Sequence, residues 1–252
     1  MSDFDRNVAA RGGFADRAAA VDAGLRAYML RVYNYMATAV ALTGVVAYAT
    51  FNAAVVTDAS GKITALTPFG QTIFSGPLSI VLLLGTLGLV FFISFRINSL
   101  QYTTAMALFM LYAALLGVTL SSIFLTYTGA SITRVFFISA ASFGALSLYG
   151  YTTQRDLSAM GSFLIMGLFG IIIASLVNIF LKSSGLDWAI SVIGVGVFAG
   201  LTAYDTQRIK EMYDSMDDDG TIGRKAIMGA LSLYLDFINL FLMLLRLVGD
   251  RR

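Results

Sequence analysis

The chain has 252 residues, of which 58% are hydrophobic and only 13% are charged, and its mean hydropathy is +0.78. Soluble domains carry charge on about a quarter of their residues, so this composition excludes a soluble enzyme, a nucleic-acid-binding protein and a disordered chain. A net charge of +2 indicates no polyanionic partner, and the absence of His and Cys excludes disulfides, structural zinc and His-based triads.

Along the chain, a polar segment precedes a series of long apolar blocks. Residues 1–30 are polar and of mixed charge, and they lack the apolar core of a cleavable signal peptide. Each later block approaches the ~20 residues that a helix needs to cross a bilayer. The blocks lie at about 32–52, 77–95, 103–125, 133–151, 160–181, 188–207 and 226–247. They predict an all-α polytopic membrane protein with seven transmembrane helices in residues 31–248, followed by a short basic tail, 249–252.

Basic residues are distributed unevenly between the two sides of the predicted bundle. Eleven of the 17 Lys and Arg residues precede the first block or lie in the second, fourth and sixth loops, whereas only Lys62, Arg134 and Lys182 lie in the other loops. This bias predicts a cytoplasmic N-terminus in the cell's inner (plasma) membrane. The basic tail opposes seven full crossings, so a re-entrant last segment is the alternative to the favoured seven spans.

Few polar groups interrupt the apolar blocks, and such groups are candidates for function. Asp236 lies at the middle of the last block, with Asn239 one turn away, and Asp205 ends the sixth block. Arg96 closes the second block, and Asn178 is a polar residue in the fifth. Each also has a simpler interpretation. Asp205 could be a helix-end carboxylate in water, Asp236 a structural hydrogen-bonding group, and Arg96 a snorkelling anchor.

The two aspartates are stronger candidates for function when they are considered together. Because one loop joins their helices, Asp205 and Asp236 are expected on helices packed side by side. Two carboxylates in a partly desolvated site cannot both ionise cheaply, so the pair would titrate as a unit. In a chain without histidine this is the most direct route to a pH switch. By contrast, the acidic run Asp217–Asp219 in the sixth loop is interpreted as a solvated segment.

The sequence around both aspartates resembles the Bax inhibitor-1, or transmembrane Bax inhibitor motif, family, whose bacterial members include YccA-like proteins. The resemblance rests on residues 204–207 (Tyr-Asp-Thr-Gln) and 233–241 (Leu-Tyr-Leu-Asp-Phe-Ile-Asn-Leu-Phe). It implies a seven-helix fold with the last helix central in the bundle. It also implies a pH-sensitive calcium leak in which two aspartates, here Asp205 and Asp236, share a proton. The family's latch arginine on the second helix matches Arg96.

These observations favour a proton-gated Ca²⁺ path without a tightly bound cofactor. Asp205 and Asp236 would contact the transported ion, with Asn239 and Asn178 as supporting oxygen ligands. Lipid, Ca²⁺ and protons are then the partners. A binding role, as a regulator of a membrane protease or stress-response partner, is the alternative. An intramembrane aspartyl protease is disfavoured because the Gly-x-Gly-Asp and Pro-Ala-Leu motifs are absent, and a secondary transporter because no repeat is evident.

Overall fold

A computed structural model describes residues 3–58 and 62–252, with side chains from residue 21 onward. Seven helices in these residues are long and apolar enough to cross a membrane, which confirms the predicted all-α polytopic fold. The long helices are α1 (Asp3–Ala54), α3 (Pro77–Arg96), α4 (Tyr102–Leu120), α6 (Gly129–Thr152), α7 (Ser158–Leu181), α8 (Ser184–Glu211) and α9 (Asp219–Val248). Short elements connect them: β1 (Val55–Thr57), β2 (Ile63–Leu66), α2 (Pro68–Phe74), a 3₁₀ turn η1 (Ile97–Ser99) and α5 (Ile123–Thr126).

The helix boundaries follow from local chemistry. Pro68 and Pro77 lie in the first turns of α2 and α3, where the missing N–H of proline has no helical partner to lose. Thr128, Ser183 and Asp218 cap α6, α8 and α9, and each side chain accepts a hydrogen bond from a first-turn backbone N–H. No proline therefore lies inside a predicted span, so none of these helices is kinked by proline.

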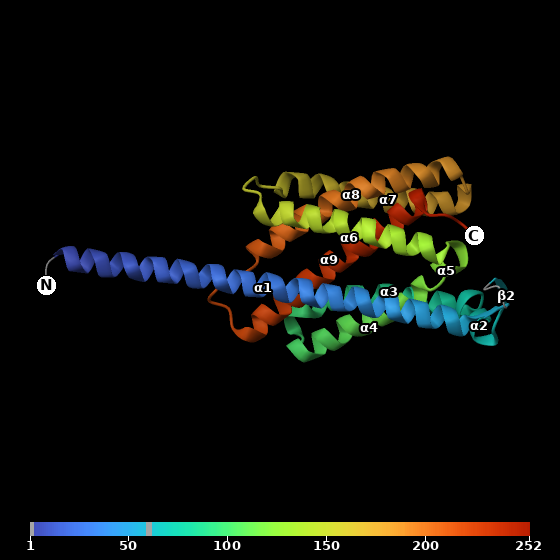
Figure 1. The fold of residues 1–252 in the computed structure, drawn as a ribbon, viewed down its shortest axis with the longest axis horizontal. Coiled ribbons are helices and arrows are strands. Elements are labelled where there is room, and N and C mark those ends of the chain that lie inside the picture. The colour runs from blue at the N-terminus through green and yellow to red at the C-terminus, as the bar shows by residue number, and fades with distance from the viewer. Residues whose placement is uncertain (1–2, 59–61) are drawn as a thin grey trace.

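The helices form two groups with α9 running between them (Figure 1). The helices α1 to α4 lie in one group and α6 to α8 in the other, and α9 crosses diagonally from one to the other. Along its length α9 packs against α1, α4, α6 and α8. In its most apolar window 67% of the residues are buried, against 11% in α3 and in α7. The apolar surfaces of α3 and α7 therefore face lipid, whereas α9 packs against protein.

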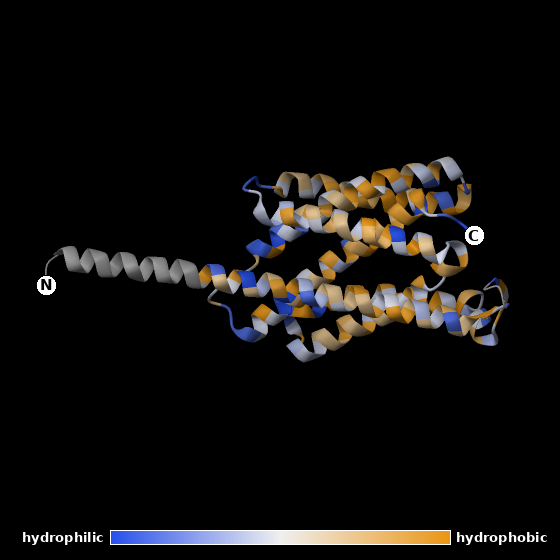
Figure 2. Cartoon of the chain, viewed as in Figure 1, coloured by the Kyte–Doolittle hydropathy of each residue, from blue (hydrophilic) through white to orange (hydrophobic). Residues whose placement is uncertain are grey.

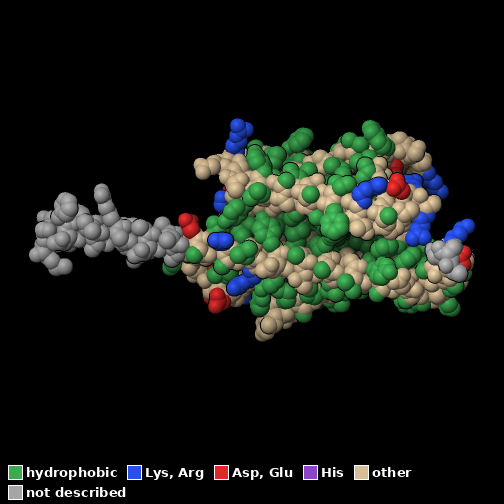
Figure 3. Space-filling view, in the orientation of Figure 1, with side chains coloured by type: hydrophobic (Ala, Val, Ile, Leu, Met, Phe, Trp, Pro, Cys, Tyr) green, Lys and Arg blue, Asp and Glu red, His purple; other side chains and the backbone are tan. Residues whose placement is uncertain are grey.

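Polarity is distributed along the bundle as a bilayer requires. Hydrophobic residues occupy the middle of the helices, and the more hydrophilic residues gather towards their ends (Figure 2). On the face in Figure 3, Lys, Arg, Asp and Glu side chains likewise lie near the two ends, with an uncharged band between them. The band is the part that hydrocarbon would cover.

The last helix spans the bundle without interruption. α9 has 30 residues, or about 45 Å of helix at about 1.5 Å per residue. The tail beyond it is tied to the end opposite the N-terminus: Thr128 N–H donates to the Asp250 carbonyl at 3.1 Å, and Arg251 pairs with Tyr127 as an antiparallel bridge. A continuous helix of this length favours a full crossing over the re-entrant alternative. The basic tail is held on the far side by backbone hydrogen bonds and by the Arg134–Asp250 ion pair at 2.9 Å.

The acidic run in the loop between α8 and α9 has structural roles. Asp217 pairs with Lys225, whose Nζ also donates to the Met212 carbonyl at 2.8 Å, and Asp218 caps α9. The same loop contacts α1, because the rings of Tyr28 and Tyr213 lie 5.6 Å apart. Asp218 and Asp219 are exposed, as expected for a solvated segment, whereas Asp217 is partly buried in its ion pair.

Candidate functional site

The structure brings Asp205 of α8 and Asp236 of α9 together. Their carboxyl groups lie close enough to hydrogen-bond to each other. The Asp236 residue is 5% exposed and the Asp205 side chain 15% exposed, so the contact lies inside the bundle. A hydrogen bond between two carboxyl groups needs a proton on one of them. Two carboxyl groups placed in this way can share one proton.

One oxygen of this pair is unusual. Asp236 Oδ2 is buried and, among the residues that the structure describes, has no hydrogen-bond partner. A buried acceptor without a partner costs about 1–3 kcal/mol, and more if it is charged. Such a group persists where it serves something other than stability. The unpaired oxygen is available to a proton, a water or a cation that enters the bundle.

The motif around Asp236 fixes α9 against three neighbours at once. Tyr234 is fully buried, and its hydroxyl lies 2.6 Å from Thr43 Oγ1 of α1. Its ring packs edge-to-face on Phe109 and Tyr112 of α4. Phe237 packs edge-to-face on aromatic rings of α6. Because successive helix residues point about 100° apart, Asp236 is left facing α8.

The residues next to Asp205 in its motif each pack against, or hydrogen-bond to, a neighbouring helix or loop. The Tyr204 ring packs so closely on Gly161 of α7 that a side chain there would collide with it. Thr206 Oγ1 lies 2.9 Å from Ser147 Oγ of α6. Gln207 fixes the loop between α6 and α7, accepting from Leu157 N–H at 2.9 Å and donating to the carbonyl of the loop residue 155 at 2.8 Å. The motif therefore packs α8 against α6 and α7 while Asp205 faces α9.

Glycines allow the two acidic helices to approach. A Cβ on Gly229 of α9 would lie 2.9 Å from Ile209 Cγ2, and one on Gly194 of α8 would lie 2.8 Å from Met243 Sδ. Both distances are shorter than real contacts allow, so a larger residue at either position would force Ile209 or the flexible Met243 side chain to shift. The sequence motif Gly196-x-x-x-Gly200 predicts close packing, and only Gly200 provides it, against Leu164. Gly196 has open space around it.

Asp205 opens onto a small cavity at the end of α8. The cavity has a volume of about 30 Å³ and is lined by Asp205, Arg208, Ile209, Met212, Met228, Gly229 and Ser232. This space is enough for a single water. Arg208 Nη1 lies 4.0 Å from Asp205 Oδ1, so a cation faces the exposed side of the pair. Sequence reasoning missed Arg208, although its spacing of three residues from Asp205 on one helix is a usable signal.

The predicted latch residue occupies a different position. Arg96 ends α3 and its side chain is exposed. Within the described residues its guanidinium has no ion pair or hydrogen bond, and α3 lies in the group of helices opposite α8 (Figure 1). In this structure the arginine that faces Asp205 is thus Arg208. A latch through Arg96 stays a prediction for another conformation.

Among the described residues, neither of the two predicted asparagines hydrogen-bonds to the aspartate pair. Asn239 Nδ2 donates to the carbonyl of Leu235 in its own helix at 2.8 Å. Asn178 lies near the end of α7, where its Oδ1 accepts from Ser183 N–H at 3.0 Å. That position is next to the start of α8, whereas Asp205 lies 21 residues further, or roughly 30 Å along the helix. Asn178 therefore belongs to a separate site.

The pair offers few ligands for a resident metal. In the part of the chain that the structure describes, no group of three or more His, Cys, Asp or Glu residues could hold an ion. Two carboxyl groups supply at most four oxygens, whereas Ca²⁺ takes 6–8. An ion at Asp205 and Asp236 would keep much of its hydration and would leave as readily as it entered.

A hydroxyl relay extends from the site towards α1. Tyr33 hydroxyl lies 2.6 Å from Ser147 Oγ, which in turn lies 2.9 Å from Thr206 Oγ1, the residue after Asp205. Tyr33 and Ser147 also line a largely apolar cavity of about 620 Å³ between α1 and α6. The relay therefore connects the α8 motif to a cavity at the side of the bundle. Scattered hydroxyl residues give no sequence signal that would have identified it.

Comparison with known proteins supports the resemblance seen in the motifs. The family described as "Inhibitor of apoptosis-promoting Bax1" matches residues 25–252. The inner membrane protein YbhL of Escherichia coli K12 is 50% identical over 232 residues, covering 91% of this chain and 94% of that protein. An uncharacterized protein of Rickettsia prowazekii is 52% identical over 231 residues, covering 92% of each chain. YrjE of Lactococcus lactis is 38% identical over 227 residues, covering 90% and 92% respectively.

Proposed function

This chain belongs to the Bax inhibitor-1 family of membrane proteins, and on that premise we propose that it is a pH-sensitive Ca²⁺ leak channel. The observation that carries the proposal is the buried contact between the carboxyl groups of Asp205 and Asp236. The proton in this contact is the switch, because its loss places two negative charges side by side between α8 and α9.

Gating follows from what the shared proton does to helix packing. With one proton, the pair joins α8 to α9 and closes the bundle around Asp236. A change in proton number alters the attraction between these helices, and the close contacts at Gly194 and Gly229 transmit the change along their interface. The equilibrium between closed and open arrangements then depends on pH.

Calcium suits such a path as cargo rather than as a resident ion. Carboxylate oxygens are the ligands that Ca²⁺ prefers, and loss of the shared proton would leave the oxygens of Asp205 and Asp236 free to contact the ion. Two carboxyl groups supply too few oxygen ligands to hold the ion tightly. Weak binding permits conduction, since an ion must leave a site as readily as it enters.

We further propose that the N-terminus is cytoplasmic and that the aspartate pair lies towards the cytoplasmic end of the bundle. The basic residues of the α8–α9 loop and of the N-terminal segment lie at this end, as the positive-inside rule requires. A single cysteine introduced at Ser215, in the α8–α9 loop, tests the orientation in intact cells. Protection from an impermeant thiol reagent is expected, and labelling would place the loop outside.

The central experiment measures Ca²⁺ leak in liposomes that contain the purified full-length chain, at a series of pH values on both sides of neutrality. We expect the wild-type leak to vary with pH and the Asp236→Asn leak to be independent of pH. The asparagine amide can still donate to Asp205, so the contact survives while the shared proton is lost. Asp205→Asn should behave in the same way.

Asp156→Asn is the matched control, because Asp156 is an exposed carboxylate in the loop between α6 and α7. This variant should leak like the wild type at every pH. If Asp236→Asn keeps the wild-type pH-dependent leak, the proposed mechanism fails. Equal circular dichroism spectra and melting temperatures would show that the comparison is between folded proteins.

A further inference from the structure

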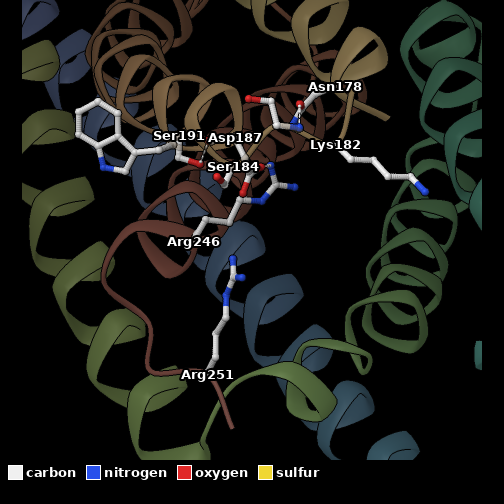
Figure 4. A pocket seen from close by; sticks show the side chains of 9 residues that line it. Asn178, Lys182, Ser184, Asp187, Ser191, Arg246 and Arg251 are labelled. Carbon is white, nitrogen blue, oxygen red and sulfur yellow. Dashed lines mark hydrogen bonds and ion pairs between the residues drawn. The ribbon is translucent and has the colours of Figure 1, made fainter. Parts of the chain in front are cut away.

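A second site lies at the end of the bundle opposite the aspartate pair. It is a pocket of about 410 Å³ between the end of α7, the start of α8, the end of α9 and the C-terminal tail (Figure 4). Its lining residues are Asn178, Lys182, Ser183, Ser184, Asp187, Trp188, Ser191, Arg246 and Arg251. Nothing in the proposed leak mechanism uses these residues.

The pocket is cationic. Lys182, Arg246 and Arg251 contribute three positive charges against the single carboxylate of Asp187. Arg246 Nη1 lies 3.8 Å from Asp187 Oδ1, which satisfies part of one guanidinium. In Figure 4 the Arg251 side chain extends from the tail towards Arg246. The Asp187 carboxylate offsets part of the repulsion between these cations.

Two of the cations have no protein partner. Among the described residues, neither the Lys182 ammonium nor the Arg251 guanidinium makes an ion pair or hydrogen bond. Other basic residues at this end are engaged: Arg134 pairs with Asp250, and Arg252 donates to the Tyr127 carbonyl at 3.2 Å. Of these two unpaired cations, Arg251 extends towards Arg246, whereas the Lys182 side chain extends away from it (Figure 4).

The backbone holds these cations in place. The tail is fixed on both sides of Arg251, by Thr128 N–H donating to the Asp250 carbonyl and by Arg252 N–H donating to the Thr126 carbonyl. Lys182 ends α7 in the left-handed conformation (φ 50°), a position that usually favours glycine. The hydrogen bonds of the tail thus fix the backbone of Arg251, and the end of α7 fixes the backbone of Lys182.

Neutral donors complete the lining. Asn178 uses its Oδ1 to accept from Ser183 N–H, which leaves its amide N–H groups free to donate. Ser184 lies in the first turn of α8, where backbone N–H groups have no helical acceptors. Arginine, lysine, amide and hydroxyl donors around a space of this size match the oxygens of a tetrahedral anion.

We propose that this pocket binds a phosphate group. A phosphate group can reach this pocket from two sources. Trp188 at the rim is 64% exposed and neighbours the lipid-facing end of α7, so the phosphate of an anionic phospholipid can reach it. The mouth also opens to water at the bundle end, so free phosphate can enter. Both sources present the same oxygens to Arg246 and Arg251.

The test measures binding to the full-length chain in detergent. One arm uses inorganic phosphate in calorimetry, and the other counts bound phosphatidylglycerol by native mass spectrometry, with zwitterionic phosphatidylcholine as the comparison lipid. Arg251→Gln should weaken binding of the phosphate source about 10-fold, since it removes one charge-assisted contact. Asp187→Asn should strengthen binding, because it removes the competing carboxylate of Arg246.

Lys62→Gln is the matched control: it removes one charge from the same end of the bundle, outside the pocket. It should bind like the wild type. Binding of phosphatidylglycerol alone identifies the lipid as the source, and binding of inorganic phosphate alone identifies the free anion. If neither probe binds, or if Arg251→Gln and Asp187→Asn both bind like the wild type, the proposal is overturned. Opposite effects of these two variants cannot arise from unfolding.

Discussion

Arg208 lies one helical turn after Asp205 on α8 and places its Nη1 4.0 Å from the Asp205 Oδ1. The guanidinium is at the end of α8, where the negative end of the helix dipole also favours a cation. Its side chain is 58% exposed, so water weakens its field at the pair without abolishing it. The aspartate pair is therefore asymmetric, with one carboxyl group facing a cation and the other enclosed by apolar side chains.

The first prediction concerns this cation. Arg208→Gln removes the charge that favours the ionised form of Asp205, so the pair should hold its proton to higher pH. The midpoint of the pH-dependent Ca²⁺ leak should rise by about half a pH unit, as expected for a largely exposed ion pair. Liposome flux over a pH series measures it. An unchanged midpoint in Arg208→Gln together with a shifted one in Arg96→Gln would instead identify Arg96 as the controlling arginine.

The second prediction concerns the hydroxyl contact between Thr43 of α1 and Tyr234 of α9. Thr43 Oγ1 also lies 2.9 Å from the Ala113 carbonyl of α4. When the Tyr234 hydroxyl donates to Thr43 Oγ1, the single hydroxyl hydrogen of Thr43 donates to that carbonyl. Thr43→Val leaves the buried Tyr234 hydroxyl without an acceptor and should lower the free energy of unfolding by about 1–3 kcal/mol. Tyr234→Phe should cost less, because Thr43 keeps its carbonyl acceptors. Thermal unfolding in detergent gives the order, and the reverse order would contradict this account.

The third prediction uses two glycines as a matched pair. Gly229→Ala forces a methyl group against Ile209, whereas Gly196→Ala enters open space. Overpacking costs about 1–3 kcal/mol, while alanine in place of a helical glycine gains up to about 1 kcal/mol. Gly196→Ala should therefore raise the melting temperature, and Gly229→Ala should raise it less or lower it. Equal stabilisation by both would show that α8 and α9 do not require the close approach.

The fourth prediction concerns the cap of α9. Hydrogen bonds from the Thr221 hydroxyl and backbone N–H hold the pKa of the Asp218 carboxyl below its usual range. A lowered pKa means that the cap stabilises the helix above the ordinary aspartate range, and that this stability is lost as the pH falls through the lowered value. Asp218→Asn should remove the acid dependence and Asp218→Ala should remove the cap at every pH. Hydrogen exchange at the Thr221 amide reports both effects, and exchange in wild type that does not change on acidification would contradict them.

The sequence determined the fold class and the identity of the aspartate pair. Hydrophobic length alone predicts the seven helices, since a bilayer requires about 20 apolar residues for each crossing. The scarcity of charge then makes Asp205 and Asp236 conspicuous, because an acidic group in a span is costly wherever it lies. Helix adjacency, implied by a single connecting loop, was sufficient to expect them to meet.

Only the tertiary structure decided the surroundings of that pair and the existence of a second site. The contact between Asp205 and Asp236 inside the bundle depends on which faces of α8 and α9 pack inward. The tail's pairing with Tyr127 and the ion pair between Arg246 and Asp187 depend on contacts between residues far apart in the chain. Hydrophobicity constrains where a helix crosses but not how it is rotated, because many rotations bury similar apolar area. Close packing at glycines and buried hydroxyls selects one rotation, and that choice fixes which polar groups meet.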